Sequence, residues 1–434
     1  MDRGALDQVY LNNNRLLALP PKLGRCQRLE ILNVARNNIA RVPVSVGRLT
    51  ALRSLDLSEN PLTHLPHEIG GVDAEEFADV CGLLSIQRIS LMHCAFLVAL
   101  PSKLFRLTTL EELTLIGADG LTQPPMEVQA GGLEHIQLYL RRQYEGEQSM
   151  KVDFSGLGLV DVPLMFSNLD RRLNEIQPAI AGMDKLLHLN LSHNFLERLN
   201  RNMRFLTNLR SLRVEYNRLQ ELPVFIQHFT RLGLLAFSHN PLDNLVNEMR
   251  QMKLIRTIVG SYNRLSFIND AVGFLETLTD ITLEHNQITS IPEPVLKLSG
   301  LVVLRLGSNQ IKRVPEQITA MRSLKQLHLA DNLLVTVPEV LGDMEALQDL
   351  DLADNRIEFL PVGLGRLTTL TKLEVRRNGC IRPPKGTQVK GPAAIVEYLR
   401  RVDSALQCRC LPCLLPTPAS WRQRRAIGPL RTRH

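Results

Sequence analysis

An asparagine recurs at a fixed spacing along this chain of 434 residues. Nine asparagines follow one another 23 residues apart without a break, at positions 194, 217, 240, 263, 286, 309, 332, 355 and 378. Asn14, Asn37 and Asn60 keep the same spacing near the start. Each closes the frame LxxLxLxxNxL, as in LRSLDLSENPL (52–62). A unit this short cannot bury an apolar core alone, so the chain must fold as a stack of repeated coils.

The spacing inside each unit predicts how one coil is built. Every second residue of LxLxx is apolar, which sends the leucines to one face of a short strand and the intervening residues to the other. The asparagine amide can donate to and accept from backbone groups that a tight turn leaves unpaired, so we expect it to link neighbouring coils. Stacked coils form a parallel sheet, with looser helical segments such as 315–324 outside it. The expected fold class is therefore α/β, a horseshoe-shaped solenoid with a parallel concave sheet.

The 23-residue unit also carries the form LPxxIxxLxxL, seen in LPHEIG (65–70) and VPEQI (314–318). In this form the chain resembles the intracellular, Ras-group type of leucine-rich repeat protein over roughly residues 1–402. The resemblance implies a scaffold whose concave face binds small GTPases, phosphatases or other signalling proteins.

One motif, which we call the closing phrase, occurs twice in the chain. HIQLYLRR (135–142) and AIVEYLRR (394–401) each follow a Pro-Pro pair, and the two copies lie 259 residues apart. In each copy a glycine precedes a short predicted helix with an apolar side, which ends at the paired arginines, where positive charge is favoured. This ending resembles the closing coil of intracellular leucine-rich proteins, including those joined to Roc-type GTPase domains. We therefore expect two capped blocks in tandem, 1–145 and 150–402, and a basic, disordered tail, 403–434.

The repeat is interrupted in two places and begins abruptly. Residues 71–85 hold eleven extra residues that suggest an acidic helical excursion on the convex side or a tolerated surface loop. Near 167–182 the chain skips a strand segment, so either one coil lacks its strand or the gene model has lost a piece. The chain starts almost inside a repeat at Leu6, with no polar cap before it.

Two sets of side chains are candidates for a protein-binding surface on the concave face. The first is a stripe of tyrosine and histidine rings, each directly before one of five consecutive repeated asparagines. Such side chains are typical of interface hot spots. The second is an acidic patch beside a basic edge, which could steer a partner of opposite charge. Ordinary turn-covering rings and solvated strand charges explain the same pattern, and both interpretations stay open. The stripe is His193, Tyr216, His239, Tyr262 and His285; the patch is His328, Asp331, Asp351, Asp354, Arg376 and Arg377.

Other classes of function find little support. No GxxxxGK or GxGxxG loop is present, and no nucleophile sits in a Gly-flanked turn, so we expect no enzyme, cofactor or metal. Aromatic residues make up only 5% of the chain. The net charge of +7 resides mostly in the tail, whose six arginines face one aspartate, so we expect no specific nucleic-acid partner. No signal peptide, membrane-length apolar run or paired terminal cysteines appear, which favours a cytoplasmic protein.

The expected function is a non-enzymatic scaffold or adaptor, a monomer that recognises a protein on its concave face. One alternative is the sensor portion of a larger GTPase, kinase or ubiquitin ligase. Another is a peripheral membrane protein, anchored if Cys408, Cys410 or Cys413 is acylated beside the tail arginines.

Overall fold

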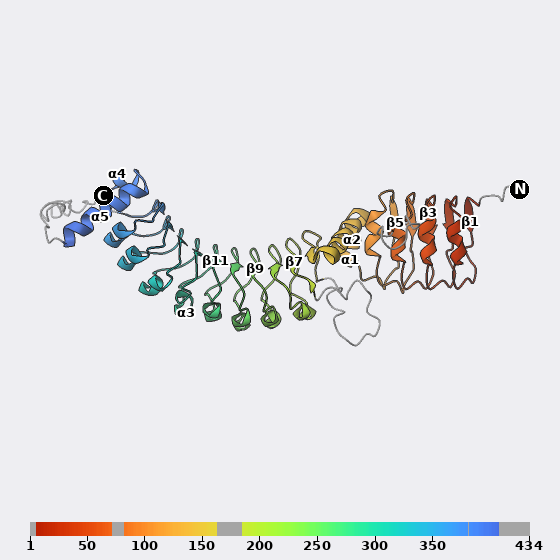
Figure 1. The fold of residues 1–434 in the computed structure, drawn as a ribbon, viewed down its shortest axis with the longest axis horizontal. Coiled ribbons are helices and arrows are strands. Elements are labelled where there is room, and N and C mark those ends of the chain that lie inside the picture. The colour runs from red at the N-terminus through yellow and green to blue at the C-terminus, as the bar shows by residue number, and fades with distance from the viewer. Residues whose placement is uncertain (1–5, 72–81, 163–184, 381, 408–434) are drawn as a thin grey trace, which may run out of the picture. The chain divides into compact units, whose positions relative to one another are not determined.

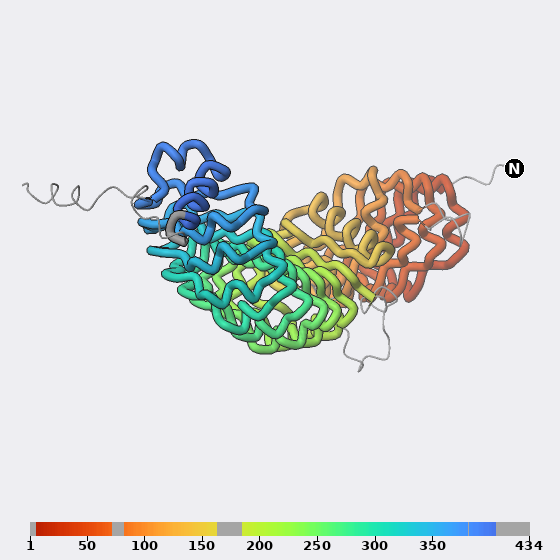
Figure 2. Tube along the Cα trace, turned by 60° about the vertical axis from the view of Figure 1, so that its left-hand side comes forward, coloured from red at the N-terminus to blue at the C-terminus, as the bar shows by residue number. Residues whose placement is uncertain are grey.

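The computed structural model describes residues 6–71, 82–162, 185–380 and 382–407. The chain divides into two compact units, residues 1–263 and 264–434, which are described separately. Figure 2 shows that successive coils of each unit lie side by side.

Each coil contributes one strand of three residues. The strands of the first unit are β1 (Gln8–Tyr10), β2 (Ile31–Asn33), β3 (Ser54–Asp56), β4 (Arg88–Ser90), β5 (Glu112–Thr114), β6 (Lys151–Asp153), β7 (His188–Asn190), β8 (Ser211–Arg213), β9 (Leu234–Ala236) and β10 (Thr257–Val259). The strands of the second unit are β11 (Asp280–Thr282), β12 (Val303–Arg305), β13 (Gln326–His328), β14 (Asp349–Asp351) and β15 (Lys372–Glu374). They form a five-stranded sheet, β1 to β5, and a ten-stranded sheet with five strands in each unit. The pairs within each unit are parallel, and leucine stands opposite leucine, as Leu189 opposite Leu212. The predicted solenoid with two tandem repeat blocks is confirmed.

Short helical turns return the chain from one strand to the next (Figure 1). Most are single 3-10 turns that follow an extended residue, usually proline, because proline fixes its own φ and cannot donate a backbone N–H. In the first unit they are η1 (Pro21–Arg25), η2 (Val44–Arg48), η3 (His67–Gly70), η4 (Ser102–Arg106), η7 (Arg201–Phe205), η8 (Val224–His228) and η9 (Asn247–Gln251). In the second unit they are η10 (Asp270–Phe274), α3 (Glu293–Leu296), η11 (Glu316–Ala320), η12 (Glu339–Asp343) and η13 (Val362–Arg366).

The repeated asparagine links each coil to the one before it, as its position predicts. Asn240 Nδ2 donates to Val214 O of the preceding coil and to Phe237 O of its own coil, both at 3.0 Å. Its Oδ1 accepts from Leu219 N, also at 3.0 Å. The same three contacts recur at Asn37, Asn60, Asn217, Asn263, Asn309, Asn332, Asn355 and Asn378. The leucines beside them are buried, so each coil adds one layer to a continuous apolar core.

Both closing phrases form helices, as predicted. The first follows α1 (Met126–Ala130) and is α2 (Gly132–Ser149); the second follows α4 (Lys385–Gln388) and is α5 (Pro392–Gln407). The prediction that they end at the arginine pairs is wrong, because α2 and α5 continue for seven and six residues beyond Arg142 and Arg401. In α2 the added turns contact η4, where Arg106 Nη2 donates to Tyr144 OH at 2.9 Å. In α5 they extend into the stretch expected to be tail, and Asp403 lies 3.9 Å from Arg366 of η13.

The interruptions of the repeat fall largely outside the described residues, which exclude 72–81 and 163–184. Strand β3 nevertheless pairs directly with β4, and β6 with β7, so no strand lies between the members of either pair. Leu157 stands where asparagine is expected and has no polar side chain. Asn194 Oδ1 compensates by accepting from both Leu157 N and Leu159 N, at 3.1 and 2.9 Å.

Candidate functional site

The residue before each repeated asparagine has a left-handed backbone. The five ring positions of the predicted stripe have φ between 53° and 57°. In the three coils before that of Tyr262, the N–H of this residue donates to the next coil, for example Tyr216 N to Ser238 O at 2.9 Å. The turn thus directs one side chain per coil away from the core at the end of the strand. A bulky residue with this φ is uncommon, since a left-handed conformation costs roughly 1–2 kcal/mol.

Four of these side chains form a continuous stack, which we call the ring ladder: His193, Tyr216, His239 and Tyr262. Ring centroids of successive members lie 4.2, 4.0 and 4.2 Å apart, with interplanar angles of 11–12°. The two tyrosines are 46% and 48% exposed. Because each ring is held by its neighbours, the ladder presents apolar edges and hydroxyls in a fixed arrangement. His285 takes the same turn position in the second unit.

A second aromatic contact, which the sequence interpretation missed, flanks the ladder. The Arg218 guanidinium carbon lies 4.8 Å from the centre of the Phe195 ring. Phe195 is 48% exposed, which extends the apolar surface beyond the ladder. Each residue directly follows its repeated asparagine, so the 23-residue period could have placed the two on adjacent coils.

Polar groups on the strand side of the ladder are already engaged with one another. Glu215 accepts from Ser192 Oγ at 2.6 Å and pairs with Arg213 at 3.3 Å. Farther along this face, burial lowers the pKa of His188, and nearby Lys151 and Arg210 lower it further. His188 therefore favours its neutral form.

The predicted charged patch lies in the second unit, where four of its six members lie beside an opposite charge. His328 and Asp351 face each other in the register of β13 and β14. His328 Nε2 lies 3.4 Å from Asp349 Oδ2, and Lys372 Nζ lies 3.6 Å from the same oxygen. Asp349 and Lys372 were missed, although the two-residue period of a strand places them on the same face as Asp351 and Glu374.

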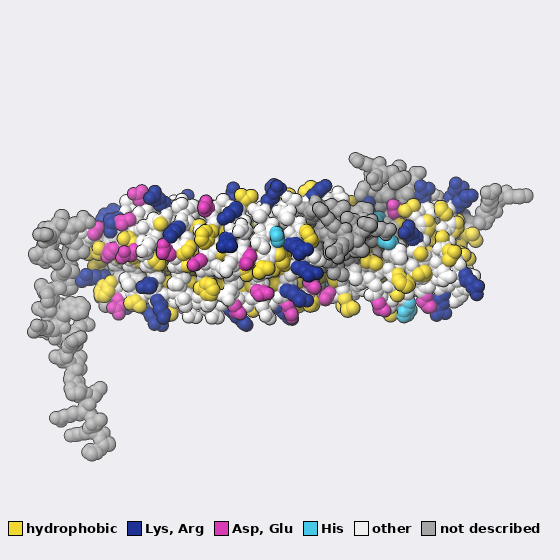
Figure 3. Space-filling view, turned by 90° about the horizontal axis from the view of Figure 1, so that it is seen from below, with side chains coloured by type: hydrophobic (Ala, Val, Ile, Leu, Met, Phe, Trp, Pro, Cys, Tyr) yellow, Lys and Arg dark blue, Asp and Glu magenta, His cyan; other side chains and the backbone are white. Residues whose placement is uncertain are grey.

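The remaining members of the patch also form ion pairs. Arg377 pairs with Asp354 at 3.1 Å and Arg376 with Glu374 at 3.5 Å, whereas Asp331 is exposed. Acid and base thus partly neutralise each other within this cluster. Elsewhere, basic and acidic side chains are interspersed over the face shown in Figure 3.

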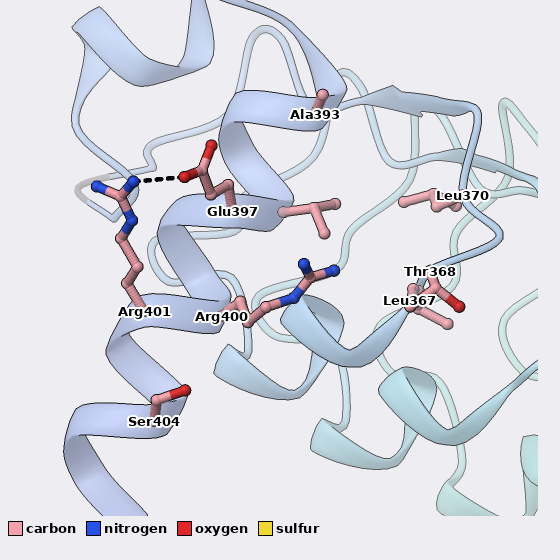
Figure 4. A pocket seen from close by; sticks show the side chains of 9 residues that line it. Leu367, Thr368, Leu370, Ala393, Glu397, Arg400, Arg401 and Ser404 are labelled. Carbon is pink, nitrogen blue, oxygen red and sulfur yellow. Dashed lines mark hydrogen bonds and ion pairs between the residues drawn. The ribbon is translucent and has the colours of Figure 1, made fainter.

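A pocket of about 940 Å³ lies beside α5 (Figure 4). It is lined by Leu367 and Leu370 on one side and by Val396 and Arg400 on the other. Arg400 Nε is bonded to Gly365 O at 3.0 Å. Thr368, Glu397, Arg401 and Ser404 also line the pocket, and Arg401 pairs with Glu397.

The described residues contain neither a metal-binding cluster nor a membrane-spanning helix. No group of three or more His, Cys, Asp or Glu side chains there could hold a metal ion. No helix in this part of the chain is long and apolar enough to cross a membrane. Cys408, Cys410 and Cys413, the expected acylation sites, lie outside the described residues.

Comparisons with known proteins agree with the fold. Two family models match, one described as a leucine-rich repeat region at residues 268–402 and one as a leucine rich repeat at residues 5–62. No curated protein is similar enough to count as a match. Among solved structures, a leucine-rich repeat protein of Leptospira interrogans is 26% identical, with a TM-score of 0.51, and the match covers 88% of this chain and 80% of that one.

Two further solved structures are more distant. The ectodomain of the Arabidopsis thaliana receptor kinase GASSHO1/SCHENGEN3, in complex with CASPARIAN STRIP INTEGRITY FACTOR 2, is 22% identical over 83% of this chain and 43% of its own, with a TM-score of 0.46. An internalin of Listeria monocytogenes is 18% identical over 85% and 86% of the two chains, with a TM-score of 0.41. The repeat, the two parallel sheets and the matching family models together show that this chain contains leucine-rich repeats and has the leucine-rich repeat fold.

Proposed function

We propose that this chain is a non-enzymatic, cytoplasmic scaffold that binds a protein partner through the open face and edge of its sheets. The ring ladder is the observation that carries the proposal. Its tyrosines expose almost half of their surface, yet stacking already fixes their positions. Ordering them on binding therefore costs little conformational entropy, and rigid, amphipathic tyrosines are common anchors of protein interfaces.

The charged cluster of the second unit supports a contribution to specificity. Its ion pairs are mostly exposed, so each contributes little to folding stability and can exchange partners. A partner with complementary charges would gain association rate and discrimination from such a cluster. The resemblance of the repeats to the Ras-group type makes a signalling GTPase or phosphatase the first class of partner to test.

The test is a quantitative pulldown with the whole chain as bait. In the variant bait, Tyr216→Ala and Tyr262→Ala remove both tyrosines of the ladder. The matched control, Val224→Ala with Phe274→Ala, removes apolar side chains that are 62% and 56% exposed from helical turns. We expect the ladder variant alone to lose specific partners by about tenfold or more. If both baits retain the same proteins, the ladder is not the binding surface.

A further inference from the structure

The first closing helix is covered on two sides. One side of α2 packs on η4 of the first block, and another packs on β6, the first strand of the second block. The rings of Tyr139 and Phe154 stack with centroids 4.9 Å apart. Arg142 Nη1 donates to Ser155 O at 2.5 Å, and both stacked rings are fully buried. Helix α2 therefore both ends one block and begins the next.

A glycine allows this close approach. A Cβ on Gly146 would lie 2.4 Å from Val152 Cγ2 and 3.3 Å from Lys151 O. Val152 is only 2% exposed, so it has little room to move. The contact between α2 and β6 is thus as close as a contact within the core.

The second closing helix, α5, packs on a helical turn of its own block, as α2 packs on η4. Helix α5 packs on η13, and Ile395 and Leu399 are each 1% exposed. Arg366 lies 3.9 Å from Asp403, repeating the contact between Arg106 and Tyr144 in the first copy.

Among the described residues, no strand packs on the other side of α5, which corresponds to the side of α2 that contacts β6. Tyr398, the counterpart of the buried Tyr139, is partly exposed, and Arg401, the counterpart of Arg142, is exposed. Arg401 pairs with Glu397 of its own helix, as Figure 4 shows. Helix α5 thus presents the face that, in α2, receives the first strand of a block.

Strand β1 is the matching open element. It begins the first block as β6 begins the second, so Val9 and Leu11 correspond to Val152 and Phe154. Leu11 is 39% exposed, whereas Phe154 is fully buried. Tyr10 is 58% exposed beside it. The described residues thus leave an apolar strand face uncovered where β6 has α2 against it.

We propose that copies of this chain associate head to tail, with α5 of one copy covering β1 of the next as α2 covers β6. The occupant is a second copy because the chain itself already contains this junction. Tyr398 lies against Leu11, and the Arg401 guanidinium donates to the carbonyl of Asn12, which corresponds to Ser155. Because the two surfaces differ, the contact is heterologous and leads to growing chains of copies rather than closed two-fold dimers.

This proposal departs from the monomer expected from the sequence, and sedimentation velocity of the whole chain distinguishes the two. One variant, Tyr398→Asp with Arg401→Glu, blocks the α5 surface; the other, Val9→Asp with Leu11→Asp, blocks the β1 surface. We expect a concentration-dependent series of oligomers for the unmodified chain and monomers for each variant alone. An equal mixture of the variants retains one open α5 surface and one open β1 surface, so it should form a 1:1 dimer and nothing larger.

The mixture also shows that each variant is folded, since each must supply its unmodified surface. The control Val224→Asp with Phe274→Asp, on exposed helical turns, should associate like the unmodified chain. A monomeric unmodified chain overturns the proposal, as does a mixture of folded variants that stays monomeric. Self-association that survives in either variant alone also overturns it.

Discussion

Replacing one repeated asparagine should open the stack locally, and Asn240→Ala is the most informative case. The three carbonyls that accept from Asn240 Nδ2 each keep another donor; Val214 O, for example, still accepts from Asn217 Nδ2 at 3.1 Å. Among the described residues, the backbone N–H of Leu219 donates only to Asn240 Oδ1, and Leu219 is fully buried. The substitution therefore leaves one buried N–H without an acceptor.

The loss in free energy of unfolding follows from these changes in hydrogen bonding. A buried, unsatisfied donor costs about 1–3 kcal/mol, and the weakened bonds to the carbonyls add about 1 kcal/mol. We expect a total of about 2–4 kcal/mol, concentrated between the coils of β8 and β9. Asn240→Cys should cost less, because Cys94 at the equivalent place donates to Leu57 O of the preceding coil at 3.4 Å.

Hydrogen exchange measured by mass spectrometry is the suitable assay, because long repeat arrays need not unfold in one step. Peptides that contain Leu219 should exchange much faster in Asn240→Ala. The matched control is Asn244→Ala, whose exposed side chain makes no hydrogen bond among the described residues. Equal exchange around Leu219 in the two variants would refute the assignment of Asn240 as a link between coils.

Three further predictions concern the α2 junction and the cysteines. Burial raises the pKa of the Glu147 carboxyl to about 7 from 4.5, so the folded chain binds the carboxyl proton more tightly than the unfolded chain does. The stability of the fold should therefore fall as pH rises from 4.5 to 7. In Glu147→Gln the melting temperature should depend less on pH between about 5.5 and 8. Gly146→Ala should destabilise the junction by about 1–3 kcal/mol, seen as faster hydrogen exchange in β6, whereas unchanged exchange would mean that the contact is looser than described. Burial raises the pKa of the Cys94 and Cys380 thiols, so iodoacetamide should label Cys26 before either, as read from peptide masses.

The repeat made the strands, the asparagine contacts and the closing helices predictable, because each depends on residues within one unit or its neighbour. Asn240 makes the same three contacts as eight other repeated asparagines, so one argument covers all of these. The extra turns of α2 were not predictable in this way. They depend on Arg106 meeting Tyr144, which are 38 residues apart and outside the repeating frame.

The candidate surface was predictable in position but not in detail. The 23-residue period placed His193 to Tyr262 on adjacent coils, yet it gave no sign that their backbones are left-handed. That conformation comes from the turn, which accepts many residue types, so no single residue marks it. The pairing of Asp354 with Arg377 was also hidden, because side-chain rotamers decide whether adjacent charges form a pair or remain separate.

The two copies of the closing phrase show that the role of each closing helix depends on the strand packed against its outer side. Because α2 covers Val152 and Phe154, the second block takes its first cap from the block before it. A boundary at 145 would divide α2 and expose both side chains, each worth about 1.5–3 kcal/mol when fully buried. A fragment of residues 132–434 should therefore be more stable to urea than one of residues 150–434, by up to about 3–6 kcal/mol. Adding Phe154→Ala to both fragments should shrink the difference; equal stability of the two unmodified fragments would show that α2 belongs to the first block alone.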